Sequence, residues 1–275
     1  MEAKEITSLS ESPWQAWLSC SEPQLLHFYE PEQGLFIAET PNVIERALRA
    51  GYEPVSYLID RKLVTAQVTQ LLAESGEIPV YLAADDVINS IQGIHLTRGV
   101  FCAMRRRKQE FAPEKLEGIR RIALLENVVN PTNLGAVFRS AAALGIDMVL
   151  LTADCTDPLY RRAARVSMGT VFQVPWQKCP ACPTSEILRK LKQEHGFQSA
   201  AMALCKDSVS IADPQLKGAE KLVIVLGTEG EGLKPETIAA CDWTVLIPMM
   251  HGVDSLNVAA ASAVAFWELR QQDRP

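Results

Sequence analysis

The chain has 275 residues, of which 48% are hydrophobic and 22% charged, so it can form one large or two medium globular domains. Its net charge of −6 argues against a protein that holds nucleic acid by bulk charge, although Met104–Lys108 and Tyr160–Arg165 are locally basic. Residues 1–17 carry early acids and no long apolar run, which predicts neither a secretory signal nor a membrane span. The seven cysteines are scattered and odd in number, so we expect no disulfide framework and a cytoplasmic protein.

The first half of the chain opens with a β-α-β pattern. An apolar run, LFIAE, is followed by Thr40 and Pro41 as the cap and first turn of an amphipathic helix that reaches Ala50, with Gly51 as its stop. A second apolar run lies around residues 55–59. The segments IPVYLA and GVFCAM predict further short strands in this half.

A charged stretch that contains proline separates the two halves. Residues 105–118 show little apolar pattern, which is typical of a linker, and we place a domain boundary there, near Ala112. The predicted domains are 1–112 and 113–275.

The second half alternates strand-like and helix-like segments, which favours a mostly parallel sheet with helices on its faces. The predicted strands are RIALLE, MVLLT, SAAMAL, KLVIVLG and WTVLIP. One helix between them carries Val137, Ala141 and Leu144 as an apolar stripe and ends at Gly145. The last helix is predicted to run from about Asn257 to Gln271.

Three polar or glycine-rich segments follow strands, where ligands bind in open α/β sheets. In NVVNPTNLGAVFRSA, Asn133 can cap a helix that exposes Arg139. In LGTEGEGLKPE, the glycines permit a tight turn, but neither phosphate-loop pattern is present and Glu229 would repel a phosphate. In IPMMHGVDSLNVAAASA, Ser255 and Asn257 suit a helix cap. Taken separately, each segment has a purely structural explanation.

Taken together, the three segments resemble, in order and spacing, the three motifs of the SpoU/TrmH family of RNA ribose methyltransferases, within the SPOUT superfamily. RVSMGTVFQVP, Arg165 to Pro175, resembles the segment that this family carries between its first two motifs. The resemblance covers roughly Arg120 to Leu269, and the joint match of three motifs is specific. The N-terminal half resembles the smaller, ribosomal-protein-like α/β domain with which many members bind RNA.

The resemblance implies a fold, a cofactor and partners. It implies a parallel sheet with a deep trefoil knot, whose loops clasp S-adenosylmethionine mainly through backbone groups. The implied cofactor-binding residues are Leu226, Gly227, Gly230, Ile247, Met249 and Leu256. It also implies an RNA substrate, rRNA or tRNA, and a homodimer in which each active site is completed at the subunit interface.

The resemblance further implies a set of catalytic residues. Arg139 would be the central one, near a phosphate and the target hydroxyl, with Ser255 and Asn257 orienting the ribose or Arg139. Asn133 would position the Arg139 region, and Glu229 would order the second motif's loop. Because a guanidinium hardly ever deprotonates, we favour a phosphate clamp that polarises the hydroxyl, with base action by Arg139 as the alternative.

Two rival functions remain open from the sequence. One is methylation of a base, against which the Ser-Leu-Asn signature and Arg139 argue. The other is a non-catalytic RNA-binding or assembly factor, which the acidic composition allows. We expect no metal site, because the close pair Cys179 and Cys182 lacks the second pair of ligands that zinc needs, and surface or core thiols are the favoured interpretation.

Overall fold

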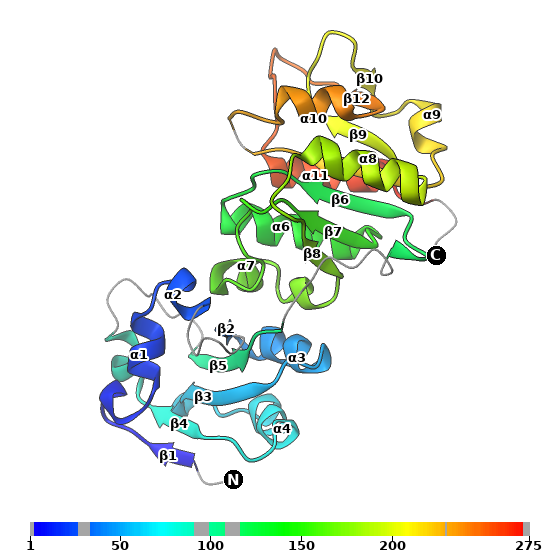
Figure 1. The fold of residues 1–275 in the computed structure, drawn as a ribbon. Helices are drawn as coiled ribbons and strands as arrows, with labels where there is room; N and C mark the ends of the chain where they lie inside the picture. Colours follow the sequence, from blue (N-terminus) through cyan, green and yellow to red (C-terminus); the bar gives the residue numbers. More distant parts are fainter. Residues whose placement is uncertain (1–2, 27–33, 91–98, 108–115, 229, 272–275) are drawn as a thin grey trace. The chain divides into compact units, whose positions relative to one another are not determined.

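The computed structural model describes residues 3–26, 34–90, 99–107, 116–228 and 230–271 (Figure 1). These residues form two compact units. The first unit comprises residues 1–108 together with Leu159–Gln173, and the second comprises 109–158 together with Val174–Pro275. The boundary predicted near Ala112 lies outside the described residues. That Leu159–Gln173 belongs to the first unit was not predicted.

The first unit contains a five-stranded mixed sheet with the strand order β1-β4-β3-β5-β2. Strands β1, β4 and β3 are parallel, whereas β5 runs antiparallel to both β3 and β2. The bounds are β1 Ala3–Glu5, β2 Leu35–Glu39, β3 Pro54–Asp60, β4 Val80–Ala83 and β5 Val100–Arg105. All of these strands except β1 were predicted from the apolar runs.

Short helices surround this sheet: α1 Trp14–Ser19, α2 Glu22–Leu26, α3 Pro41–Arg49, α4 Ala66–Glu74, α5 Asp85–Asn89 and the 3-10 turns Leu9–Glu11 and Arg61–Leu63. The helix predicted after Thr40 is confirmed as α3, with Pro41 in its first turn. Thr40 takes the cap position, but its φ of +84° leaves it without a side-chain capping bond. Gly51, at φ +77°, follows the end of the helix as predicted.

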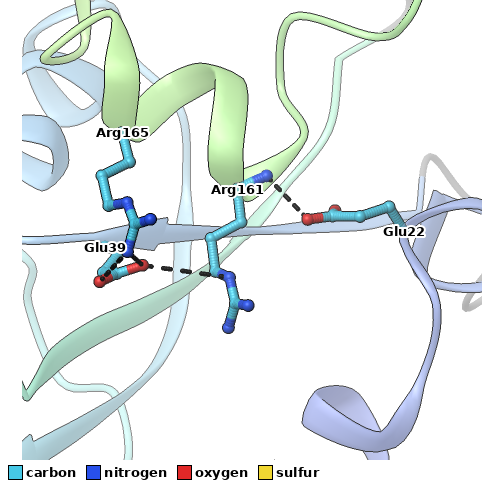
Figure 2. A network of polar contacts seen from close by, with 4 residues as sticks. All are labelled: Glu22, Glu39, Arg161 and Arg165. Atoms are coloured by element: carbon cyan, nitrogen blue, oxygen red, sulfur yellow. Dashed lines mark hydrogen bonds and ion pairs between the residues drawn. The ribbon is translucent and has the colours of Figure 1, made fainter. Parts of the chain in front are cut away.

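Helix α7, Arg161–Val166, and the 3-10 turn Thr170–Phe172 lie between β7 and β8 in the sequence but pack within the first unit. An ion pair of 3.2 Å joins Arg165 Nη1 to Glu39 Oε1 at the end of β2, and the Arg161 backbone N–H donates to Glu22 Oε1 at 2.8 Å (Figure 2). The ring of Phe172 lies 5.7 Å from Phe36 and 5.3 Å from Tyr52. Aromatic packing and ion pairing therefore anchor this segment to the sheet of the first unit.

The second unit contains a seven-stranded sheet with the order β10-β12-β9-β11-β6-β7-β8, in which every pairing is parallel. Its strands are β6 Arg121–Leu125, β7 Met148–Leu151, β8 Trp176–Lys178, β9 Gln198–Met202, β10 Val209–Ser210, β11 Leu222–Leu226 and β12 Trp243–Leu246. The five predicted strands and their parallel arrangement are confirmed. The short edge strands β8 and β10 were not predicted, because two or three residues carry no readable alternation.

Helices cover both faces of this sheet (Figure 1). Helix α8, Thr184–His195, packs with α10, Pro235–Ala240, on one face, and α6, Pro131–Ala143, packs with α11, Val258–Glu268, on the other. A small helix, α9, spans Pro214–Lys217. Because alternate residues of β6 and β11 face opposite ways, each strand contributes to both cores, and all residues of both strands are buried.

A buried arginine fastens the end of α11 to the start of the sheet. Arg121 is 3% exposed, and its Nε donates to the Leu269 carbonyl at 2.7 Å. Its amino groups donate to the carbonyls of Ala219 and Glu220, both at 2.9 Å. Burial lowers the pKa of Arg121, and the nearby Asp147 carboxylate opposes this shift. In the described ranges, no helix has both the length and the apolarity that crossing a lipid bilayer requires.

Candidate functional site

A cavity of 490 Å³ lies within the second unit, at the carboxyl ends of β9, β11 and β12. The predicted cofactor-binding residues Gly230, Ile247, Met249 and Leu256 line it, as does Ser255. The remaining lining residues are Met202, Ala203, Leu204, Glu231, Gly232, Leu233, Ile238, Val245, Leu246, Val253, Asp254 and Ala261. The second and third polar segments of the sequence therefore meet around one hollow.

The residues at the end of β9 were missed as part of this site. Met202, Ala203 and Leu204 carry no polar group, and the sequence analysis assigned them only to a strand. The strand order offers the missing signal, because β9 lies between β11 and β12 and ends at the same edge of the sheet. Leu204, Val253 and Leu256 remain well exposed around the cavity, which leaves apolar surface available to a ligand.

Leu226 and Gly227 shape the cavity loop from the end of β11. Leu226 is buried, and its carbonyl accepts from the Glu126 backbone N–H at 2.9 Å. The loop then folds back on itself, because Thr228 pairs with Gly232 in an antiparallel bridge. A Cβ at Gly227 would lie 2.4 Å from the carbonyl carbon of Gly232, so only glycine fits. Gly230 and Gly232 have φ values of +90° and +71°.

Glu126, directly after β6, holds the other end of this loop. Its Oε1 accepts from the Lys234 backbone N–H at 2.8 Å, and its Oε2 accepts from the Thr237 hydroxyl at 2.6 Å. Both bonds lie at the start of α10, and Glu126 is 1% exposed. This carboxylate ties the end of β6 to the loop between β11 and α10. Sequence analysis missed it, although an acid that ends the apolar run RIALLE is a visible signal.

Asn133 does not cap α6, contrary to the structural explanation that the sequence allowed. Asn130 is the cap, and its side chain accepts from the Thr132 backbone N–H at 2.8 Å. The earlier cap is favoured because Pro131, which has no N–H to satisfy, then takes the first helical position. Asn133 lies one turn into the helix, is 8% exposed, and accepts from Asn257 Nδ2 at 3.3 Å.

Asn257 serves two purposes at once. Its Oδ1 accepts from the Ala259 backbone N–H at 2.9 Å, so it caps α11 as the local sequence suggested. Its Nδ2 faces Asn133, so the same side chain joins the first polar segment to the third. Ser255, two residues earlier in the exposed segment, lines the cavity.

Arg139 and Glu229 have different outcomes. Arg139 is exposed on α6 and makes no hydrogen bond or ion pair with the part of the chain that the structure describes. It lies roughly one and a half turns beyond Asn133 on α6. Within one subunit, in the described residues, no hydrogen bond joins Arg139 to Asn133, Ser255 or Asn257. Glu229 lies outside the described residues. Two other acids, Glu231 and Asp254, line the cavity.

Cys179 and Cys182 belong to the packing of the second unit. Cys179 is buried in the core cluster against which Cys182 also packs, and burial raises the pKa of Cys179 to about 12. A thiol held protonated in this way is a poor nucleophile and a poor metal ligand. Within the described ranges, no group of three or more His, Cys, Asp or Glu side chains could hold a metal ion.

The cavity has the properties of a small-molecule site. Its volume falls in the range of about 300 to 1,000 Å³ that such sites occupy, and most of its lining is apolar. Its backbone turns supply hydrogen-bonding groups, and its two acids favour a ligand with a cationic part. Next to it, the Asn133–Asn257 pair fixes two polar segments relative to each other.

Comparison with known proteins gives consistent results. A model of the SpoU rRNA methylase family matches residues 120–267. An uncharacterised tRNA/rRNA methyltransferase of Mycobacterium tuberculosis is 40% identical over 241 residues, 86% of this chain and 81% of that protein. The 23S rRNA (guanosine-2′-O-)-methyltransferase RlmB of Acinetobacter baylyi is 30% identical over 206 residues, 73% of this chain and 82% of that protein. An AdoMet-bound rRNA methyltransferase from Sinorhizobium meliloti matches 99% of each chain with a TM-score of 0.79 and 26% identity.

Proposed function

The chain belongs to the SpoU rRNA methylase family, and we propose that it transfers a methyl group to a ribose 2′-hydroxyl of RNA. Membership makes it an RNA methyltransferase, as the resemblance of its three motifs predicted. The ribose hydroxyl as acceptor is supported by the relative that methylates the 2′-oxygen of guanosine in 23S rRNA. We therefore favour rRNA over tRNA as the substrate.

The cofactor is S-adenosylmethionine, which a structural relative of nearly equal length binds. The cavity fits it: Leu204, Leu246 and Leu256 offer apolar surface for a ring, and Glu231 and Asp254 offer negative charge near a cation. When bound, it supplies an electrophilic methyl group carried on a positively charged sulfur. We propose that Gly227 and Gly230 give the loop the tight turns that place its backbone beside the cofactor, and that Ile247, Met249 and Leu256 enclose it.

The polar residues would prepare the acceptor. Ser255 lines the cavity, and Asn257 is held by Asn133, so we propose that Ser255 and Asn257 orient the ribose. Arg139 is exposed and free to bind a phosphate, and its fixed charge would stabilise the negative charge that grows on the 2′-oxygen as its proton leaves. Alignment of the hydroxyl with the methyl group supplies much of the acceleration.

We propose a homodimer that completes the site. Ala260, Val264 and Trp267 are exposed on α11 at spacings of four and three residues, so they form one apolar stripe on the helix. A twofold pairing would cover such a stripe and could bring Arg139 of one subunit to the cavity of the other.

We also propose the trefoil knot and a cytoplasmic site of action. Strand β12 lies two positions away from β11 in the sheet, toward its edge. The helix that follows β12, α11, nevertheless packs against α6 and β11 near the centre of the sheet. The chain must therefore return past the loop that follows β11. All seven cysteines are free, which fits a reducing compartment.

The single observation that carries the proposal is one cavity lined by the second and third motifs, with the Asn133–Asn257 bond linking the first. The test is nucleoside analysis of rRNA and tRNA from the host organism, with the gene present, deleted and restored. Loss of one 2′-O-methylnucleoside on deletion and its return on restoration are expected. Loss of a base-methylated nucleoside, or no change in any fraction, would contradict the proposal.

A further inference from the structure

The first unit contains a cavity of its own, of 180 Å³. Its apolar side is built by Trp17, Leu18, Leu25 and Ile37, which belong to the core of this unit. Its polar side is built by Glu22 of α2 and Arg161 of α7. None of the three motifs contributes to it, so the proposed methyl transfer leaves it unexplained.

Arg161 is the polar group in this cavity that lacks sufficient partners. Its side chain is 25% exposed, and its Nε lies 4.0 Å from Glu39 Oε2, whereas Arg165 approaches the same carboxylate to 3.2 Å. The two terminal amino groups of Arg161 point away from Glu39 (Figure 2) and have no hydrogen-bond partner in the described ranges. A partly exposed guanidinium whose four terminal N–H groups are not used within the protein can donate to an acceptor that enters the cavity.

The surroundings decide between a charged and a neutral acceptor. The carboxylates of Glu22 and Glu39 both lie beside Arg161. An anion bound to Arg161 would therefore be repelled by two negative charges, and Arg165 is already paired with Glu39. A phosphate would also lose its hydration against the side chains of Leu18 and Leu25. A flat, neutral ring with acceptor atoms at its edge avoids both costs.

We propose that this cavity binds one unpaired nucleobase of the substrate RNA, whose oxygen and nitrogen acceptors receive the free N–H groups of Arg161. Arginine binds base edges in this way, and RNA is read mostly through unstacked bases placed against aromatic and apolar side chains. The volume is below the range of small-molecule sites, so it admits the base while the sugar and phosphate stay outside. The proposal rests on RNA being the substrate.

Two arginine variants with equal charge test the site. Arg161→Met removes the donor in the cavity, and Arg165→Met removes the closer partner of Glu39 without touching the lining. With rRNA from a strain that lacks the gene, Arg161→Met should weaken binding about tenfold, since it removes the donors of one bidentate contact to a base. Arg165→Met should stay within about twofold, although it should lower the melting temperature more than Arg161→Met does.

Equal binding by wild type and Arg161→Met, or equal losses in the two variants, would overturn the proposal. Wild-type methylation in the same preparation separates this outcome from failure of the proposed function. A wild-type protein that neither binds nor methylates RNA would overturn both.

Cys20 provides a second measurement that does not depend on turnover. It is a free, partly buried thiol in the lining of the same cavity. Alkylation of Cys20 by N-ethylmaleimide, located by mass spectrometry, should slow at least threefold with one or more of the four nucleoside 5′-monophosphates, and not in Arg161→Met. Inorganic phosphate should have no effect. Equal protection by inorganic phosphate, or none by any nucleotide, would contradict a nucleobase site.

Discussion

Each unit has a glutamate with a buried carboxylate at the end of a strand, and the two carboxylates are stabilised by different kinds of partner. Glu126 follows β6 in the second unit and accepts hydrogen bonds from an amide and a hydroxyl at the start of α10. Glu39 ends β2 in the first unit and is paired with two arginines of α7. Both are at most 2% exposed, so each must be satisfied by the protein rather than by water.

The difference reflects what each glutamate has to hold. Glu126 fixes a loop beside the 490 Å³ cavity, and neutral donors at short distances set its position without a mobile side chain. Glu39 holds a segment that lies more than a hundred residues away in the sequence, and it does so through long, partly exposed side chains. Rigid positioning therefore belongs to the loop beside the cavity of the second unit, and long-range attachment belongs to the first unit.

Replacing Glu126 should have the largest effect on stability. Glu126→Ala leaves the Lys234 amide and the Thr237 hydroxyl without their acceptor, and hydrogen bonds to a charged group are worth about 1.5 to 3 kcal/mol each. We expect a loss of about 3 kcal/mol in the free energy of unfolding, measured in urea. Affinity for S-adenosylmethionine, measured by calorimetry, should also fall by about tenfold or more.

Glu126→Gln and Thr237→Val should each lower the free energy of unfolding by less than Glu126→Ala does, because each keeps one of the two hydrogen bonds. Glu186→Gln is the matched control, since Glu186 pairs with Lys190 on the exposed surface of α8 and should contribute less than about 0.5 kcal/mol. An unchanged cofactor affinity in folded Glu126→Ala would show that this carboxylate does not shape the cavity.

Replacing Glu39 should have an intermediate effect. Glu39→Gln removes the buried charge and frees two arginines that can reach water, so we expect about 1 to 2 kcal/mol rather than the 3 to 5 kcal/mol of a fully buried pair. Trypsin should cut faster after the arginines of α7. Glu45→Gln, which breaks the surface pair with Arg49, is the control, and equal effects of the two changes would refute the special role of Glu39.

The two glutamates also show what the sequence could reveal. The strands and the three polar segments that follow them were predictable from the sequence pattern. The residues Gly230, Ile247, Met249, Ser255 and Leu256, which line the cavity, were singled out only through the resemblance of these segments to the family's motifs. The capping role of Asn130 was missed because two asparagines three residues apart compete for the same position, and only the constraint of Pro131 decides between them. The attachment of α7 to the first unit could not be predicted, since Glu39 and Arg165 are brought together only by the fold.

A third carboxylate, Asp242, sharpens the comparison at low pH, with the smallest expected effect. Burial alone would raise its pKa, but hydrogen bonds from Lys192 and Ser199 outweigh burial and hold the pKa below the ordinary 3.8. Because the folded pKa is depressed, its contribution to stability is present above the unfolded value and is lost as pH falls through the folded one. The free energy of unfolding should therefore decline below about pH 4.

Asp242→Asn should flatten that decline and leave the pH dependence above about pH 5 unchanged. The exposed Asp207 supplies the control as Asp207→Asn. An acid profile that is the same in wild type and Asp242→Asn would mean that other carboxylates govern acid unfolding.

The central claim is methyl transfer to a ribose 2′-hydroxyl, and alkaline hydrolysis of RNA tests it directly. RNA from a strain that lacks the gene is incubated with the purified protein and S-adenosylmethionine carrying a labelled methyl group, and then hydrolysed with alkali. A 2′-O-methyl group blocks cleavage of the adjacent phosphodiester, so the account predicts label in alkali-resistant dinucleotides with wild type, and none with folded Arg139→Ala that still binds the cofactor. Label in mononucleotides would place the methyl group on a base and contradict the account, and full transfer by Arg139→Ala would contradict the role given to Arg139.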